Sequence, residues 1–165
     1  MDVREALKLG LRRLARSVAI ISCSDEHRKY AMTATAVSEL SLDPPSMLVC
    51  INKSASIHRP IEAGQMFCIN VLSRSQQEIS ALCGGKARGA ERFNHEDWRI
   101  SEDGVPFLAN ADAVFQCRPR QRLMFGTHEV FIGEVVCVLT SPTPDPLLYV
   151  GGGYASVGEP LAAAC

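Results

Sequence analysis

Small, hydroxyl-bearing and amide side chains are concentrated between Met32 and Ser54. The first part of this stretch alternates threonine with alanine, the middle turns at an Asp-Pro-Pro sequence, and the end reads Asn-Lys-Ser. Two strands with so little bulk allow a flat ring to lie against the backbone, and their hydroxyls, the Asn52 amide and the Lys53 ammonium can hold a phosphate. The stretch therefore predicts a binding site for a flat, anionic ligand.

Many short apolar runs, separated by turn residues, must position this stretch. We expect strands at residues 17–24, 30–38, 47–52, 66–72, 111–118, 120–125, 128–140 and 147–150. Pro119 should separate two of them, because proline lacks a ladder donor, and Gly133 should bend a third. The strands do not alternate with helices, and no glycine-rich motif of the Rossmann or P-loop kind is present. The pattern predicts a mainly β, antiparallel barrel.

A few short helices are expected around the strands. An N-terminal capping box and leucines at helical spacing predict an amphipathic helix over roughly residues 2–15. A second helix should lie within residues 54–64, capped by Ser56 and ended by Gly64. A third should follow a capping box at residues 75–78.

Two segments are expected to lie outside the core of a single domain that spans residues 1–165. We expect residues 86–100 to form a mobile excursion in which Phe93 and Trp98 serve as packing anchors. We expect residues 159–165 to form a loose tail that follows a core of about 17–158.

Composition restricts the classes of function. The 165 residues are 47% hydrophobic and 21% charged, with a net charge of -1; this suits one globular domain and argues against a nucleic-acid partner. No apolar run reaches the ~20 residues of a membrane span, and charges interrupt the N-terminal region, so we expect neither a membrane segment nor a signal peptide. Seven scattered cysteines lack zinc-site spacing, and we expect buried thiols, no metal and a cytoplasmic protein.

Seven motifs, taken in order, resemble the flavin reductase family of short FMN-binding split barrels. The motifs are Met32–Ala36, Ser41–Pro45, Asn52–Ser54, Phe67–Leu72, Arg92–Phe93, Gly126–Val135 and Pro146–Tyr149. The resemblance extends from Ser17 to Tyr154. It implies a homodimer of antiparallel Greek-key split β-barrels that acts as the reductase component of a two-component, flavin-dependent monooxygenase.

The resemblance also implies the activity of an NAD(P)H-dependent flavin reductase. Hydride would pass from C4 of NADH or NADPH to N5 of FMN or FAD, and the reduced flavin would diffuse to a partner monooxygenase. Because the flavin carries the chemistry, the protein needs no nucleophile and no metal. The sequence does not decide whether the flavin is FMN or FAD, or whether the nicotinamide is NADH or NADPH. It also leaves open the identity and substrate of the partner monooxygenase, and whether the flavin is tightly bound or a diffusing substrate.

Twelve residues are implied to contact the flavin. They are Met32, Thr33, Ala34, Thr35, Ser38, Asn52, Lys53, Ser54, Ser56, His58, Lys86 and Arg92. The first five lie beside the ring and ribityl chain, the next five meet the phosphate, and the last two reach over the phosphate or the adenylate half of FAD. The structural alternatives are an ordinary Thr/Ala strand, an exposed His58 and solvated charged loops. Asn70, inside an apolar strand, needs either a structural partner or the ligand.

His128 is the candidate catalytic residue. It follows Gly126 and Thr127, where the family often has Gly-Asp-His, and with Gly126 and Tyr154 it is implied to bind the nicotinamide. Thr127 replaces a carboxylate that would orient the imidazole, which favours a binding role over strict acid–base catalysis. The structural alternatives are a histidine bonded at a strand start and a tyrosine that closes the barrel.

Two other functions fit the same fold. A non-catalytic flavin- or haem-binding split barrel is the main alternative, and the segments at residues 126–128 and 151–154 argue against it because both belong to the nicotinamide side. An oxidase resembling the pyridoxamine-phosphate oxidases would need a basic cluster for a second phosphate, and the sequence offers none.

Overall fold

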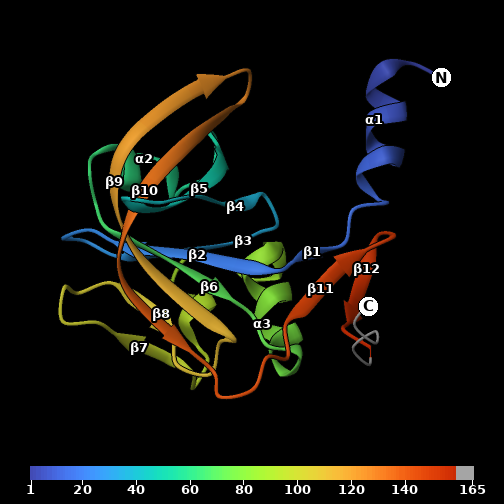
Figure 1. Cartoon of the computed structure of the whole chain (residues 1–165). Coiled ribbons are helices and arrows are strands. Elements are labelled where there is room, and N and C mark those ends of the chain that lie inside the picture. The colour runs from blue at the N-terminus through green and yellow to red at the C-terminus, as the bar shows by residue number, and fades with distance from the viewer. Residues whose placement is uncertain (159–165) are drawn as a thin grey trace.

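The computed structural model describes residues 1–158, so the expected loose tail at 159–165 lies outside the described residues. Seven antiparallel strands form the main sheet, in the spatial order β3-β2-β6-β9-β10-β5-β4 (Figure 1). Their bounds are β2 Ala19–Ser24, β3 Lys29–Ala34, β4 Val37–Leu42, β5 Pro45–Asn52, β6 Phe67–Val71, β9 Ala113–Phe125 and β10 His128–Thr140. The edge strands β3 and β4 follow each other in the chain without pairing, which agrees with the split barrel that the family resemblance implied.

Two hydrophobic clusters lie on opposite faces of the sheet. Strand β2 shows the division clearly, because Ala19, Ile21 and Cys23 belong to one cluster, while Val18 and Ile20 belong to the other. Successive side chains of a strand point to opposite faces, so a strand covered on both sides must be apolar throughout. One cluster fills the barrel and includes Ile61 from residues 58–62, and the other lies under the helical segment at residues 74–93 and the hairpin at residues 98–108.

The strand expected at residues 30–38 is interrupted. Strand β3 ends at Ala34, and β4 begins at Val37 on the opposite edge of the sheet. Thr35 and Ala36 make this crossing, where the Cys50 N–H donates to the Ala36 carbonyl at 3.0 Å. Strand propensity alone does not report that the chain changes edges, because residues on both sides of the crossing are good strand formers.

The longest hairpin joins β9 to β10, and Pro119 does not break it as expected. Pro119 pairs with Gly133 beside a register shift, where a missing proline donor is tolerated. The bulge predicted at Gly133 is confirmed. A Cβ atom there would lie 2.7 Å from both the Cys117 Cβ and the Phe67 Cζ, so only glycine fits between the strand and the barrel interior.

The N-terminal helix α1 (Val3–Leu11) begins with the expected Asp2–Glu5 capping box. None of its residues is buried, and Figure 1 shows the helix standing away from the barrel. Its hydrophobic positions, including Val3 and Leu7, therefore face solvent in a single chain.

Two other helix starts differ from expectation. Helix α2 (His58–Glu62) begins after Ile57 without a side-chain cap, so Ser56 is not its cap. The second capping box joins Ser73 to Gln76, two residues before the expected one. It starts the short helix η1 (Arg74–Gln76), which continues into α3 (Gln77–Ala81) and η2 (Leu82–Lys86).

Residues 86–100 are packed and not a mobile excursion. Helix η3 (Gly89–Phe93) and strand β7 (Trp98–Ile100) cover the second hydrophobic cluster, and β7 pairs with β8 (Pro106–Leu108). Phe93 and Trp98 stack with ring centroids 4.7 Å apart, and the Trp98 indole donates to the Arg92 carbonyl at 3.0 Å. Both aromatic residues are packing anchors, as predicted.

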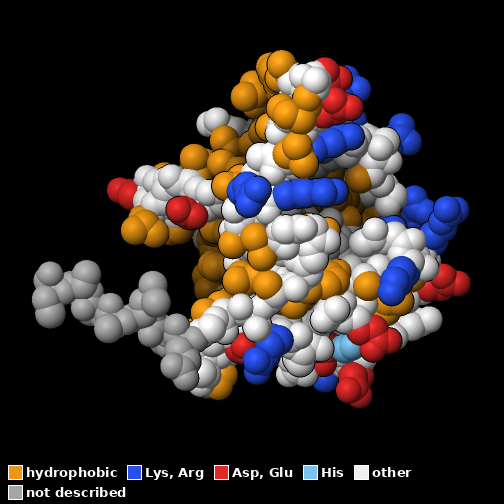
Figure 2. Space-filling model, turned by 90° about the vertical axis from the view of Figure 1, so that its right-hand side faces the viewer, with side chains coloured by type: hydrophobic (Ala, Val, Ile, Leu, Met, Phe, Trp, Pro, Cys, Tyr) orange, Lys and Arg blue, Asp and Glu red, His pale blue; other side chains and the backbone are white. Residues whose placement is uncertain are grey.

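A small sheet connects α1 to the barrel. It contains β1 (Arg16–Ser17), β11 (Leu147–Val150) and β12 (Gly153–Ser156), in the order β1-β11-β12. Figure 2 shows hydrophobic and basic side chains together on the face that carries α1 and this sheet. No helix within residues 1–158 has the length and apolar character needed to cross a bilayer.

Candidate functional site

A cavity of about 340 Å³, here named the turn cavity, lies between β3, the turn that follows β5, and helix η2. Its lining residues are Met32, Thr33, Ser54, Ala55, Ser56, Ile57, Cys83, Gly84, Gly85 and Arg92. Five of the residues expected at the flavin are thus brought together: Met32, Thr33, Ser54, Ser56 and Arg92. Three segments far apart in the sequence meet here, as an extended ligand requires.

Asn52 shapes the turn instead of facing the cavity. Its Oδ1 accepts hydrogen bonds from the Ser54 N–H and the Ser54 hydroxyl, both at 2.9 Å. An Asn side chain that binds backbone two residues on forms a local turn of this kind. The turn leaves the Ser54 and Ser56 side chains exposed at the mouth of the cavity.

Arg92 is the cationic residue that lines the turn cavity. Its Nε donates to the Ala87 carbonyl at 3.0 Å, and its Nη1 donates to the Ala31 carbonyl at 2.5 Å. These two bonds fix the guanidinium, which has five N–H donors in a planar fork. The fixed charge suits a phosphate.

Cys83 lines the same cavity as a neutral thiol. Burial raises its pKa to about 12, although the positive charge of Arg92 acts in the opposite direction. A thiol is a poor nucleophile until it ionises, so Cys83 offers no covalent chemistry near neutral pH. Within residues 1–158 no three His, Cys, Asp or Glu side chains group to hold a metal ion.

Thr33 uses its hydroxyl for the fold. The Thr33 Oγ1 donates to the Ser80 carbonyl at 2.7 Å, which ties β3 to α3. The Ser80 hydroxyl in turn lies 2.9 Å from the Tyr154 hydroxyl. Tyr154 is therefore held beside α3, with its ring edge-on to Tyr149 at 5.7 Å.

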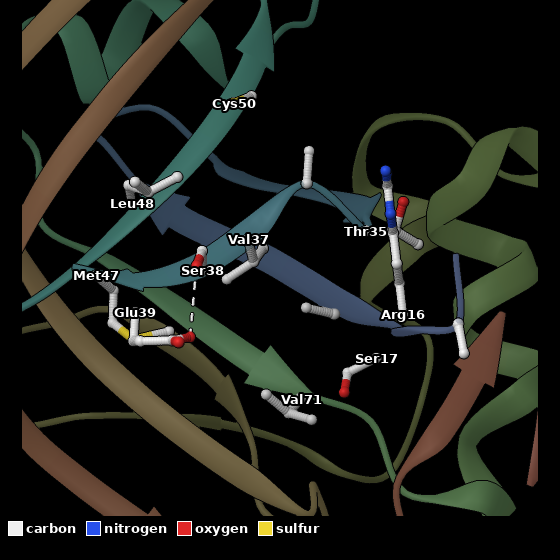
Figure 3. A pocket seen from close by; sticks show the side chains of 13 residues that line it. Arg16, Ser17, Thr35, Val37, Ser38, Glu39, Met47, Leu48, Cys50 and Val71 are labelled. Carbon is white, nitrogen blue, oxygen red and sulfur yellow. Dashed lines mark hydrogen bonds between the residues drawn. The ribbon is translucent and has the colours of Figure 1, made fainter. Parts of the chain in front are cut away.

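A second and larger cavity of about 580 Å³, here named the open cavity, lies between the two sheet edges (Figure 3). Thr35 and Ser38 line it, with Ala36 and Val37 between them. The Ala34 side chain instead packs in the barrel core, so only its backbone is available to a ligand. The small residues of the edge crossing form one wall of this cavity.

Lys53 and His128 lie together at the tip of the β9–β10 hairpin. The Lys53 N–H donates to the Thr127 carbonyl at 3.0 Å, and the Lys53 Nζ lies 3.8 Å from the Met124 sulfur. The His128 Nδ1 is 2.9 Å from the Thr127 hydroxyl, so the imidazole has a hydrogen-bond partner in the residue before it. Gly126, at φ +58°, makes the turn.

The two nicotinamide candidates do not meet in one chain. His128 pairs with Asn52 and Phe125 at the hairpin tip, while Tyr154 lies in β12 beside α3. Among the bonds of residues 1–158, none joins the two side chains. Lys86 ends helix η2 with an exposed side chain and does not line the turn cavity.

His58 and Asn70 are structural. His58 is buried, its Nε2 lies 2.7 Å from Glu129 Oε2, and it does not line the turn cavity, so the structure does not place it at the phosphate. The Asn70 amide donates to the Ile20 carbonyl and the Ser22 hydroxyl, and its Oδ1 accepts from the Leu108 N–H. The Asn70 side chain in this apolar strand therefore has structural hydrogen-bond partners.

Sequence reasoning missed several lining residues, among them Gly84, Gly85 and Arg16. Gly85, at φ +129°, carries bare backbone along the turn cavity. Arg16 lines the open cavity next to Thr35. Its only sequence signal is a basic residue directly before a strand, which says nothing of where its side chain lies.

A split antiparallel barrel with an anion-suited turn and a small-residue edge crossing defines a class of proteins that bind flat, phosphorylated ligands. A match to the flavin reductase like domain covers residues 11–158. The chain therefore belongs to the flavin reductase family.

Named relatives agree with this assignment. The chain is 37% identical to the FMN reductase (NADH) RutF of Stutzerimonas stutzeri (strain A1501), over 92% of this chain and 87% of that protein. It is 35% identical to the reductase component of the FADH(2)-dependent resorcinol hydroxylase of Rhizobium sp. (strain MTP-10005), over 93% and 87%.

Solved structures share the fold. A putative flavin reductase from Haemophilus somnus 129PT superposes with a TM-score of 0.89 at 29% identity, covering 95% of this chain and all of the other. The NADH:FAD oxidoreductase SgcE6 of Streptomyces globisporus C-1027, in complex with NAD and FAD fragments, gives 0.87 at 25% identity, covering 94% and 93%.

Proposed function

We propose that the protein is an NAD(P)H:flavin oxidoreductase. The turn cavity is the observation that carries the proposal, because it places serine hydroxyls and the fixed Arg92 guanidinium beside a strand of small residues. These residues suit the phosphate and ribityl chain of FMN or FAD. A bound flavin supplies N5 as the acceptor of a hydride from C4 of the reduced nicotinamide.

The chain's own residues bind and orient the reactants. Ser54, Ser56 and Arg92 hold the phosphate, with Lys53 adding charge from the neighbouring hairpin tip. The backbone at Thr35 and Ala36 supports the ring at the open cavity and leaves room on the other side for the nicotinamide. Holding two rings face to face replaces a bimolecular encounter with an oriented one.

The protein acts as a homodimer in this proposal. His128 belongs to the hairpin tip, where Leu123, Met124 and Phe125 are all exposed, Phe125 to 84%. Such an apolar tip is typical of a surface that meets another chain. A second copy that places its own tip over the open cavity would bring His128 and Gly126 to the nicotinamide beside Tyr154.

The reduced flavin serves a separate monooxygenase, and the protein works in the cytoplasm. The resorcinol hydroxylase reductase component supports such a partner, and the RutF relatives support NADH and FMN. The six cysteines within residues 1–158 are free thiols, as a reducing compartment allows.

Steady-state oxidation of NADH and NADPH, each with FMN and FAD, tests this function. We expect nucleotide oxidation to rise steeply when free flavin is added, most with NADH and FMN. A rate indifferent to flavin would contradict the proposal. A tightly held flavin or haem with no nucleotide oxidation would instead indicate a non-catalytic binding protein.

A further inference from the structure

A third cavity, here named the arginine cavity, lies where the end of α1 meets the small sheet. It has a volume of about 230 Å³, and its lining residues are Leu11, Arg12, Leu14, Arg16, Thr35, Tyr149, Val150, Gly151 and Gly152. Arg16 and Thr35 line both this cavity and the open cavity, so the two cavities adjoin each other at these residues. Figure 3 shows the Arg16 side chain alongside Thr35.

The backbone fixes both arginines in place. Arg16 pairs with Tyr149 in the small sheet, and the Gly151 N–H donates to the Arg12 carbonyl at 2.8 Å. Gly151 and Gly152 have φ angles of +65° and +93°, which glycine adopts without strain, and they form the tight turn facing Arg12. The cavity is thus built by secondary structure and not by a loose surface loop.

The charges of these arginines are not neutralised within the described chain. The ion pairs among residues 1–158 engage Arg74, Arg120 and Arg122, but neither Arg12 nor Arg16. Figure 2 shows basic side chains on this face, just below the hydrophobic helix. Two guanidinium groups that form no ion pair with a carboxylate of residues 1–158 favour an anion with several oxygens, since each presents several donors in a planar fork.

The remaining walls suit an aromatic ring. Leu11, Leu14 and Val150 are apolar, and Tyr149 keeps 40% of its surface exposed. An exposed tyrosine with an arginine nearby stacks readily on flat heterocycles. The cavity therefore combines an anion-binding part with a stacking part.

We propose that the arginine cavity binds the adenosine diphosphate portion of a dinucleotide. Arg12 and Arg16 hold the pyrophosphate, and the tyrosine side of the cavity receives the adenine. The proposal rests on the proposed function, since the redox ring attached to this portion then reaches Thr35 in the open cavity. NADH and FAD both carry this chemistry, and NADH fits better because the flavin phosphate is assigned to the turn cavity.

Binding of ADP-ribose, which has the portion in question but no redox ring, tests the site without turnover. We expect calorimetry to give at least a tenfold weaker affinity for Arg16→Ala and Arg12→Ala, because a charge-assisted contact contributes on the order of a tenfold factor or more. Arg16→Lys, which keeps the charge and loses the fork, should fall in between. Arg13→Ala is the matched control, since Arg13 is exposed and lines neither the arginine cavity nor the open cavity nor the turn cavity.

Kinetic measurements on the same variants show whether the bound adenosine diphosphate portion belongs to NADH or to FAD. If the bound adenosine diphosphate portion belongs to NADH, the KM for NADH rises about tenfold or more with kcat nearly unchanged. The KM for reduced nicotinamide mononucleotide, which lacks this portion, then stays the same. If it belongs to FAD, the affinity for FAD falls while that for FMN does not. The proposal would be overturned if Arg12→Ala and Arg16→Ala bound ADP-ribose and FAD as tightly as Arg13→Ala does and had the same KM for NADH. Because ADP-ribose binding needs no flavin, this outcome is separate from failure of the proposed activity.

Discussion

Arg92 has a structural role, and the proposed function adds a binding role to the same side chain. Two of its N–H groups satisfy the backbone carbonyls of Ala31 in β3 and of Ala87, directly after η2, and the side chain lines the turn cavity. The same bonds that stabilise the fold therefore hold the cation in position before a ligand arrives. Such preorganisation lowers the cost of binding an anion.

Replacing Arg92 should weaken flavin binding. Arg92→Ala removes a charged partner of the phosphate, so the dissociation constant for FMN should rise by about tenfold or more. Quenching of flavin fluorescence on titration measures it. Arg92→Lys should retain part of the affinity, and Arg4→Ala, on the exposed helix α1, should retain all of it. Unchanged FMN binding by Arg92→Ala would remove Arg92 from the site.

Replacing His128 should separate the two substrates. His128→Ala should lower kcat/KM for NADH by roughly 10–100-fold while the FMN dissociation constant stays within about twofold, because the imidazole serves the nicotinamide and not the phosphate. Thr127→Val, which removes the hydroxyl 2.9 Å from Nδ1, should give a smaller loss of the same kind. A defect confined to flavin affinity would contradict the assigned role.

At the scale of elements, the β9–β10 hairpin depends on close packing at its bulge. Gly133 faces Cys117 and Phe67 so closely that no side chain fits. The bulge lets β10 bend over the barrel interior while its far end carries His128. The position of the candidate catalytic residue therefore depends on a glycine five residues away.

The Gly133→Ala variant should be destabilised by roughly 1–3 kcal/mol, the usual cost of overpacking a core. Urea unfolding followed by circular dichroism measures the change. Gly10→Ala makes the same substitution in the exposed helix α1, where nothing lies within 4 Å of the added Cβ. It should be neutral or stabilising by up to ~1 kcal/mol. Equal stabilities of the two variants would refute the packing argument.

Across the whole molecule, buried thiols limit stability in alkali. Burial raises the pKa values of Cys23, Cys83 and Cys117 to about 12, and raises that of Cys68 further. An unfolded chain loses these protons near the ordinary thiol pKa of 9.0, while the folded chain keeps them. Between these values the unfolded state binds fewer protons, so the free energy of unfolding falls as pH rises.

The melting temperature should therefore be insensitive to these thiols below pH 9 and fall progressively from about pH 9 to 12. A Cys83→Ser variant should show a shallower decline. At pH 8 a disulfide reagent should modify the exposed Cys137 readily and the four buried thiols only after unfolding. Rapid modification of the buried thiols in the native protein would contradict their burial.

The sequence predicted the antiparallel fold and two strands to the residue, because β10 and β11 are uninterrupted runs of strand formers. It could not predict the crossing at Thr35, where strand propensity continues but the hydrogen-bonding partner changes. It also treated residues 86–100 as mobile, since their polar composition hides the packing of Phe93 and Trp98. Those errors arise from tertiary contacts that local composition does not encode.

Only part of the candidate site was predicted, because tertiary contacts also decide which of its residues meet. Ser54, Ser56 and Arg92 meet at one cavity, as the family resemblance implied. His58 turned inward to Glu129 because a buried carboxylate there needs a partner. Arg16 became a cavity residue only through the pairing of β1 with β11, which connects segments more than a hundred residues apart.

Direct transfer of hydride to flavin is the central claim, and anaerobic rapid mixing measures it without a partner enzyme. NADH mixed with the protein and one equivalent of FMN should bleach the flavin stoichiometrically, and deuterium at the transferred C4 position should slow the bleaching. An oxidised flavin spectrum that persists, with NADH unconsumed, would contradict the account.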